Sequence, residues 1–231
     1  ATREEILGQL ERIVPKGPDL IEWRADFFKE VDREEKVLAV LEEIKTKSGG
    51  LPLLFTLRSA REGGTPIPLS EEERVALICQ VCSTPFADLV DYEVLNEADH
   101  IRRIREISRK ETKKLILSYH NFEETPGKTE LLKYFLLMHF YGADGAKVAV
   151  MPKTKEDVFT LLEATREAST TLPIPLIAMS MGELGAISRI MGWYYGSSLT
   201  FTVGDKSSAP GQVPIGDLKR MIQLAQSYVP H

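Results

Sequence analysis

Short apolar runs rich in β-forming residues alternate with longer amphipathic helical patterns along almost the whole chain of 231 residues. Seven runs are predicted strands, at residues 19–27, 51–58, 86–94, 113–120, 145–150, 174–180 and 198–203. Helical patterns stand between them, at residues 33–47, 70–82, 98–110, 128–142, 154–169 and 181–196. This alternation with short connections predicts a parallel sheet. Because the strands are almost continuously apolar, both faces of the sheet are expected to be covered, as in a barrel or a doubly wound sheet.

The number of strands limits the choice of fold. A (β/α)8 barrel needs eight strands, one more than the pattern provides. The chain opens with "TREEILGQLERIV", which is typical of a helix, so we expect that a strand is missing upstream of Ala1. Ser70 and Thr154 precede acidic first turns and are predicted N-caps. We therefore predict an α/β fold, a (β/α)8 TIM-type barrel with its first strand missing from this chain, forming one catalytic domain over residues 1–231.

Composition narrows the classes of partner. The chain is 43% hydrophobic and 27% charged, which is ordinary for a soluble globular protein. A net charge of -5 gives no reason to expect nucleic acid or a membrane as a partner. Cys79 and Cys82 form a CxxC pattern on one apolar helix, and without a second such pair we expect a packed, reduced pair. The sequence carries no signal peptide or long apolar run, so a cytoplasmic location is expected.

Charged and titratable side chains fall on predicted strands or just after them, where the active sites of β/α barrels lie. They are Glu22, Arg24, Asp26, Arg58, Glu62, Asp91, Glu93, His120, Lys147 and Arg189. Each has an ordinary explanation, since a single arginine or glutamate most often forms a surface ion pair and a single histidine is most often structural. So many titratable groups at one barrel mouth nevertheless favour acid–base chemistry on a polar anion.

Lys147 is the most unusual of these residues, because it lies within the apolar run "GAKVAV". Burying an ammonium group is unfavourable unless it is paired or loses its proton. A desolvated lysine can attack a carbonyl as the free amine, and a histidine such as His120 can then transfer protons to and from the intermediate. The combination is typical of Schiff-base catalysis without a cofactor.

Metal and phosphate sites are less favoured by the sequence. Only His120 is well placed among the histidines, and neither HxH nor HExxH spacing occurs. The glycines of "GELGAISR" do not follow the spacing of a dinucleotide-binding or P-loop motif.

The chain closely resembles the type I 3-dehydroquinate dehydratases of the shikimate pathway, from its first helix to its end. The matching segments are "IEWRADFF", "FTLRSAREGG", "LVDYEV", "ILSYHNFEETP", "GADGAKVAV", "AMSMGELGAISRI" and "GSSLTFTVGDKSSAPGQVPI". The resemblance implies a barrel enzyme, usually a homodimer, that dehydrates the small molecule 3-dehydroquinate to 3-dehydroshikimate without cofactor or metal.

The resemblance also implies a role for each matching residue. Lys147 would form the Schiff base, His120 would be the general acid and base, and Glu62 would position His120. Arg189 would pair with the substrate carboxylate. The other substrate-binding residues would be Glu22, Arg24 and Arg58 at the hydroxyls, Met179 against the ring, and Ser208 and Gln212 in a lid.

Two other functions remain open at this point. A class I aldolase or transaldolase also uses a barrel lysine, although its phosphorylated substrates normally need a phosphate site. A non-catalytic barrel that binds small acids is the second alternative, but it would have little need for Lys147 and His120 together.

Overall fold

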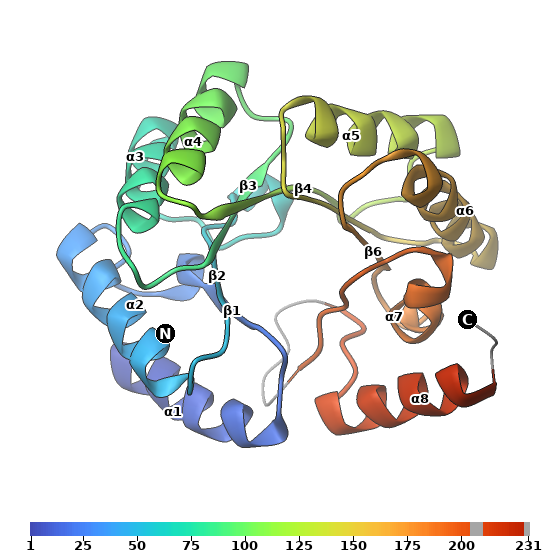
Figure 1. The fold of residues 1–231 in the computed structure, drawn as a ribbon, viewed down its shortest axis with the longest axis horizontal. Coiled ribbons are helices and arrows are strands. Elements are labelled where there is room, and N and C mark those ends of the chain that lie inside the picture. Colours follow the sequence, from blue (N-terminus) through green and yellow to red (C-terminus); the bar gives the residue numbers. More distant parts are fainter. Residues whose placement is uncertain (204–209, 229–231) are drawn as a thin grey trace. The chain divides into compact units, whose positions relative to one another are not determined.

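The computed structural model describes residues 1–203 and 210–228 and divides into two compact units. The first unit comprises residues 1–118 and 141–144, and the second comprises the described parts of 119–140 and 145–231. Helices and parallel strands alternate in both (Figure 1), which confirms the predicted α/β class. The single domain over residues 1–231 stays a prediction.

The first unit holds four strands and the helices that follow or precede them. Its strands pair in parallel in the order β1-β2-β3-β4. The elements are α1 (Arg3–Ile13), η1 (Val14–Lys16), β1 (Ile21–Arg24), η2 (Ala25–Phe27), α2 (Glu34–Lys47), β2 (Leu53–Thr56), η3 (Ala60–Glu62), α3 (Glu71–Cys82), β3 (Leu89–Glu93), α4 (Ala98–Lys110) and β4 (Lys114–Asn121), the last three residues of which belong to the second unit.

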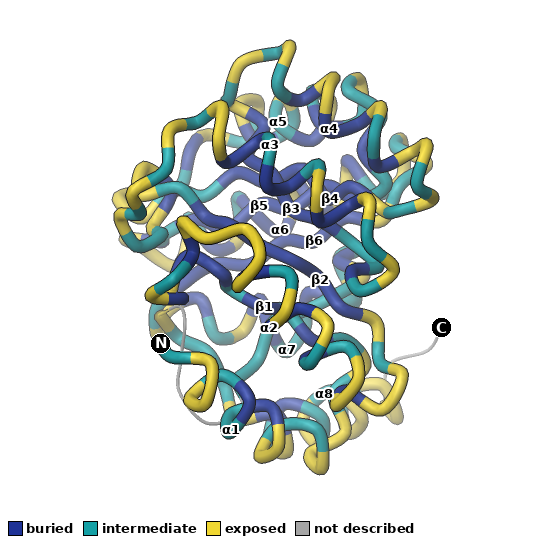
Figure 2. Tube along the Cα trace, turned by 90° about the vertical axis from the view of Figure 1, so that its left-hand side faces the viewer, coloured by how far each residue is buried: buried dark blue, intermediate teal, exposed yellow. Residues whose placement is uncertain are grey.

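The core of the first unit follows from the apolar character of its strands. All four residues of β2 are buried, so both faces of this strand are covered. Leu54 of β2 pairs with Leu89 of β3, and Phe55 pairs with Val90. In Figure 2 the strands of this unit are dark blue, whereas the outer sides of its helices carry the exposed positions.

Both predicted N-caps are confirmed. The Ser70 hydroxyl accepts a hydrogen bond from the Glu73 N–H at 3.3 Å, and the Glu73 carboxylate accepts one from the Ser70 N–H at 2.7 Å. Thr154 and Asp157 form the same reciprocal pair at the start of α6. These capping boxes satisfy backbone donors that the first turn of a helix leaves free, and they fix where the helices begin.

The second unit holds the last residues of β4 and two strands that pair in parallel. Lys147 lies opposite Ile177 in this pairing, and Ala149 lies opposite Met179. Every residue of both paired strands is buried. The elements are α5 (Lys128–Phe140), β5 (Gly145–Val150), α6 (Lys155–Thr171), β6 (Leu176–Ser180), α7 (Ala186–Met191), η4 (Gly192–Tyr195) and α8 (Ile215–Tyr228).

The predicted strand at 198–203 is wrong, because the described chain forms only isolated bridges there. The free edge of β6 is bound by serine hydroxyls instead of a neighbouring strand. Ser197 Oγ accepts the Ala178 N–H at 3.0 Å, and Ser188 Oγ accepts the Ser180 N–H at 2.9 Å. Two donors that a seventh strand would need are therefore already occupied.

The stretch 198–203 instead continues toward the start of α8. The Val203 N–H donates to the Val213 carbonyl, and the Ile215 N–H donates to the Val203 carbonyl, both at 3.2 Å. Residues with β propensity thus form a connecting segment, in which residues 199–203 are half-buried.

Candidate active site

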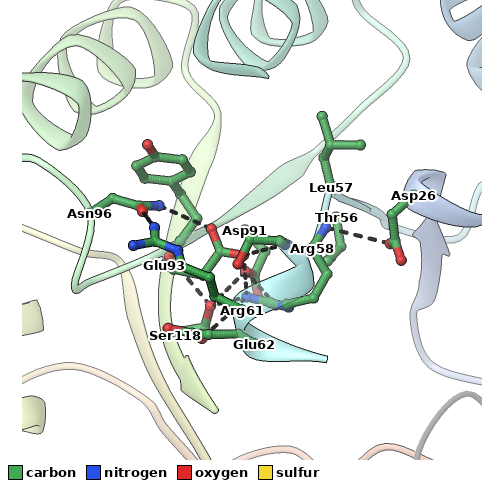
Figure 3. Close-up of polar contacts among 12 residues, drawn as sticks. Asp26, Thr56, Leu57, Arg58, Arg61, Glu62, Asp91, Glu93, Asn96 and Ser118 are labelled. Carbon is green, nitrogen blue, oxygen red and sulfur yellow. Dashed lines mark hydrogen bonds and ion pairs between the residues drawn. The ribbon is translucent and has the colours of Figure 1, made fainter. Parts of the chain in front are cut away.

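In the first unit, Arg58 is the centre of a buried cluster of charges just after β2 (Figure 3). Its guanidinium donates to Asp91 Oδ1 at 2.6 Å and to Ser118 Oγ at 2.7 Å. Glu93 Oε1 lies 3.3 Å from Arg58 Nη1. Burial alone would lower the pKa of Arg58, but the surrounding carboxylates raise it above its ordinary value.

Glu93, at the end of β3, joins this cluster to α3. Its carboxylate accepts hydrogen bonds from the Ser59 N–H at 2.7 Å and from Arg74 Nη2 at 3.1 Å. Although burial favours the protonated acid, Arg58 and Arg74 outweigh it and hold the pKa of Glu93 below its ordinary value. Glu93 is therefore a buried carboxylate that stays ionised.

Glu62 lies in the loop that follows β2. It is 8% exposed, and its Oε2 atom is 3.9 Å from Arg58 Nη1. The loop doubles back on the strand, since the Gly64 N–H donates to the Ser59 carbonyl at 2.8 Å. A Cβ atom at Gly64 would lie 2.1 Å from the Arg58 carbonyl oxygen, so only glycine fits there.

Glu22 and Arg24, which were predicted to bind substrate, lie on β1 with half-buried side chains. Glu22 accepts the Thr56 hydroxyl at 2.9 Å. Arg24 makes two hydrogen bonds to Asp26, at 2.7 and 2.8 Å. The sequence suggested that Asp26 continues the strand, but it lies in the short helix η2, where its carboxylate can fold back onto Arg24.

In the second unit, Lys147 occupies the third position of β5 and is 4% exposed. Its Nζ atom lies 4.1 Å from the centroid of the Phe201 ring. The face of an aromatic ring attracts a cation, and Phe201 presents its face to this nitrogen. The sequence did not single out Phe201, which belongs to the segment that was predicted as a strand.

Arg189 of α7 is 1% exposed. It donates to the carbonyl oxygens of Phe201 at 3.1 Å and Pro210 at 3.2 Å, and its Nη1 atom contacts the Met179 sulfur at 3.6 Å. Its buried Nε atom has no hydrogen-bond partner, and no carboxylate of the described residues forms an ion pair with it. Burial lowers the pKa of Arg189 to about 10. Arg189 thus presents a buried positive charge that the described chain leaves without a counter-ion.

His120 is the second-last residue of β4, in the part of the strand that belongs to the second unit, and it is half-buried. Side-chain contacts hold both of its neighbours, Tyr119 and Asn121, in place. The Tyr119 ring stacks on Tyr134 with centroids 4.0 Å apart. Asn121 Oδ1 accepts the backbone N–H groups of Glu123 and Glu124, and its amide donates to the Tyr119 hydroxyl at 3.2 Å. The backbone at His120 is therefore fixed from both sides.

Three predicted substrate-binding residues remain: Met179, Ser208 and Gln212. Met179 is buried in β6, and Gln212 is half-buried in the segment before α8. Ser208 lies outside the described residues.

Two residues of the Arg58 cluster, Arg74 and Ser118, were missed by the sequence reasoning, and Asp91 and Glu93 were noted without a role. The sequence around Arg74 did indicate that its side chain is buried. Arg74 stands on the same helical face as Leu77, Ile78 and Val81, at spacings that mark a buried stripe, so a charge there must be paired inside.

The described residues form neither a disulfide nor a metal site. Cys79 and Cys82 are free, and burial raises the pKa of Cys82 to about 12. Over residues 1–203 and 210–228, no three His, Cys, Asp or Glu side chains gather in a way that could hold a metal ion. No described helix combines the length and the hydropathy needed to cross a bilayer.

Comparison with known sequences places the chain in a family. A sequence model of the type I 3-dehydroquinase family matches residues 1–228. The chain is 47% identical over 231 residues to the 3-dehydroquinate dehydratase of Geobacillus sp. (strain WCH70), covering 100% of this chain and 89% of that protein. It is 51% identical over 225 residues to the enzyme of Geobacillus thermodenitrificans (strain NG80-2), covering 97% and 87%.

Solved structures of 3-dehydroquinate dehydratases are also similar to this chain. The crystal structure of the 3-dehydroquinate dehydratase of Geobacillus kaustophilus HTA426 matches with a TM-score of 0.97 at 47% identity, over 99% of this chain and 88% of that one. The type I enzyme of Clostridium difficile, crystallised with covalently modified comenic acid, matches with a TM-score of 0.95 at 35% identity, over 99% and 90%. These matches confirm the predicted TIM-type α/β barrel class with strands missing. The chain belongs to the type I 3-dehydroquinase family.

Proposed function

We propose that the chain eliminates water from 3-dehydroquinate to give 3-dehydroshikimate, through a Schiff base at Lys147. The observation that carries this proposal is a lysine 4% exposed on a strand whose six residues are all buried. Burying a charged ammonium group is unfavourable for stability, so a lysine at such a position favours a chemical role.

The steps follow from the chemistry of an imine. The Lys147 amine attacks the substrate ketone, and loss of water leaves a cationic iminium carbon. This cation withdraws electrons, so the proton on the adjacent C2 can be removed to form an enamine. The enamine then expels the C1 hydroxyl, which takes up a proton and leaves as water. Hydrolysis of the iminium releases 3-dehydroshikimate and regenerates the amine.

Proton transfer in these steps is assigned to His120, with Glu62 as the residue that positions it. His120 would remove the C2 proton, protonate the leaving hydroxyl and assist imine formation and hydrolysis. The fixed backbone on both sides of His120 supports this role, because a general base must be held at a defined position.

The substrate carboxylate is assigned to Arg189. A guanidinium group binds a carboxylate through two parallel hydrogen bonds, and such a pair is strongest where water is excluded. The buried charge of Arg189 supports this assignment, since among the described residues no carboxylate pairs with it and the substrate carboxylate would supply a counter-ion.

The other substrate contacts are proposed on the basis of the family. Glu22, Arg24 and Arg58 would bind the hydroxyl groups, and Met179 would contact the ring. Gln212 and Ser208 would belong to a closing lid, of which only Gln212 lies in the described part of the chain. The hydrogen bonds of Arg58 to Asp91 and Ser118 support its role, because they hold the guanidinium in one orientation.

We also propose that residues 1–231 act as one catalytic domain in a cytoplasmic homodimer. The match of the family model to residues 1–228 supports a single catalytic domain. The two free cysteines are compatible with a reducing compartment. Apolar side chains exposed on α5 and α6 support self-association, since a homodimer would remove them from water: Leu136, Phe140 and Phe159.

A steady-state assay of 3-dehydroquinate turnover, followed by the absorbance of the new enone, tests this function. We expect turnover by the wild-type protein and none above background for Lys147→Ala. A folded wild-type protein that binds 3-dehydroquinate but forms no enone would contradict the proposal.

A further inference from the structure

A hollow on the first unit is lined mainly by cationic side chains. It measures about 450 Å³ and lies along α4 at the segment that follows α5. Its lining residues are Arg102, Arg105, Glu106, Arg109, Lys110 and Tyr141. Four cations and one carboxylate therefore face a space large enough for a small molecule, in a chain whose net charge is -5.

Two of these arginines have side-chain N–H groups without a hydrogen-bond partner among the described residues. Arg105 is 9% exposed and pairs through Nη1 with Asp144, yet its buried Nε–H has no hydrogen-bond partner. Arg109 is exposed, and its guanidinium makes no hydrogen bond or ion pair with the described residues. The exposed guanidinium of Arg109 is available to a ligand, and the buried Arg105 contributes its positive charge.

The backbone leaves room for both side chains. Gly142 adopts a φ of +75°, and a Cβ atom there would lie 3.3 Å from Arg109 Nη2 and 4.0 Å from Arg105 Cδ. Any larger residue would both strain the backbone and press on the guanidinium of Arg109. Glycine at this position leaves room for the tip of the Arg109 side chain.

Helix electrostatics explains only part of this arrangement. Basic side chains in the last turn of a helix interact favourably with its dipole, which accounts for Arg109 and Lys110. Arg105 and Arg102 lie about one and two turns earlier, respectively, beyond the range of that effect. Arg102 also pairs with Asp99 at 2.6 Å, but both side chains are largely exposed, so solvent weakens this pair.

We propose that this hollow binds the phosphate group of a phosphorylated small molecule. A phosphate dianion neutralises more of the four cations than a carboxylate can, and guanidinium groups bind its oxygens through paired hydrogen bonds. Lys110 precedes β4, so the site is at the amino-terminal end of this strand. Active sites of β/α barrels use the opposite ends, and this site is therefore separate from substrate binding.

Calorimetric titration of the whole chain with inorganic phosphate, pyrophosphate and phenyl phosphate tests the proposal, with citrate as the carboxylate comparison. The test variant is Arg109→Ala, and Arg103→Ala is the matched control, because Arg103 lies on the same helix outside the hollow and pairs with Glu72. We expect phosphate-bearing ligands to bind more tightly than citrate. Arg109→Ala should weaken them at least about tenfold, since it removes charge-assisted hydrogen bonds, and Arg103→Ala should change affinity less than about twofold.

Equal losses in the two variants would indicate diffuse attraction and overturn the proposal, as would citrate binding as tightly as pyrophosphate. Absence of any binding by the folded wild-type protein would do the same. If phenyl phosphate binds and inorganic phosphate does not, the occupant is an organic phosphate ester; the reverse result would identify the free anion as the occupant and overturn the proposal. Enone formation is measured in parallel and is expected to be unchanged in Arg109→Ala, so failure of this site is distinguishable from failure of the proposed reaction.

Discussion

The Nζ atom of Lys147 lies 4.1 Å from the centroid of the Phe201 ring, within the second unit. An aromatic face at this distance stabilises a cation by about 0.5–2 kcal/mol. The iminium at Lys147 would carry its positive charge at the same nitrogen. Phe201 is therefore placed to stabilise the cationic intermediate.

Replacing this ring tests its electrostatic contribution. Phe201→Leu keeps an apolar side chain but removes the aromatic face, so kcat should fall by roughly 2- to 30-fold, the equivalent of about 0.5–2 kcal/mol. Phe201→Tyr keeps the ring and should retain most of the activity. Steady-state kinetics with 3-dehydroquinate decides the point, and equal kcat values for the Leu variant and the wild type would rule out this role.

Arg189→Met should separate stability from substrate binding. The pKa of Arg189 is lowered from 12.5 to about 10, so the charged form is disfavoured in the folded state by on the order of 3 kcal/mol. This unfavourable contribution is fully present below pH 10 and is relieved as pH rises toward 12.5. Methionine removes the charge but also two hydrogen bonds to carbonyl oxygens, each worth about 0.5–1.5 kcal/mol.

Because the two effects oppose each other, Arg189→Met should be no less stable than the wild type at pH 7.5, while its KM should rise roughly 100-fold through loss of the carboxylate pair. Arg189→Lys, which keeps a charge without the planar fork, should show an intermediate KM. Urea unfolding and steady-state kinetics give the two quantities. A strongly destabilised Met variant with a normal KM would mean that Arg189 is only structural.

Glu93→Gln should destabilise the protein at neutral pH and reduce its sensitivity to acid. The change removes the buried carboxylate shared by Arg58 and Arg74, and breaking a buried ion pair typically reduces the free energy of unfolding by about 3–5 kcal/mol. Because the pKa of Glu93 is below its ordinary 4.5 in the folded state, its stabilising contribution is present above about pH 4.5 and is lost as the pH falls below that value.

Glu97→Gln is the matched control, since Glu97 is an exposed glutamate shortly after the same strand. Urea unfolding followed by circular dichroism at pH 7 and below pH 4.5 measures both effects. If the Glu97 and Glu93 variants unfold alike at pH 7, the buried cluster does not stabilise the fold in this way.

Ser197→Ala tests whether a hydroxyl group substitutes for a strand at the edge of β6. Without Ser197 Oγ, the buried Ala178 N–H loses its acceptor, which should lower the free energy of unfolding by about 1–3 kcal/mol. Ser198→Ala, at the exposed neighbouring position, should change it by less than about 0.5 kcal/mol. Equal stability of the two variants would show that the Ala178 donor finds another acceptor.

Local rules made much of the fold predictable from the sequence. Ser70 and Thr154 cap their helices as predicted, because the capping interaction involves residues only three positions apart. Six of the seven predicted strands form, because an apolar run flanked by helices has few alternatives to a buried parallel strand. The predicted strand at 198–203 does not form, because the hydroxyl groups of Ser188 and Ser197 already accept the N–H groups at the β6 edge. This is a tertiary contact, which strand propensity does not describe.

The candidate site was predictable in its residue types but less so in its contacts. Lys147 was singled out as a charge in an apolar run, and Arg189 as a charge just past a strand; both side chains are buried. The partners of Arg58 could not be assigned, because Asp91, Glu93 and Ser118 come from other strands and their distances depend on register. The contact of Phe201 with Lys147 has the same origin, since these residues are far apart in the chain.

Borohydride reduction in the presence of 3-dehydroquinate tests most directly whether Lys147 is the amine that forms the imine. Intact mass and peptide mapping should show one adduct per chain, on the peptide that contains Lys147. The adduct should be absent from Lys147→Ala and still form, more slowly, in His120→Ala. An adduct on another lysine, or a Lys147→Ala variant that turns over 3-dehydroquinate at the wild-type rate, would contradict the mechanism.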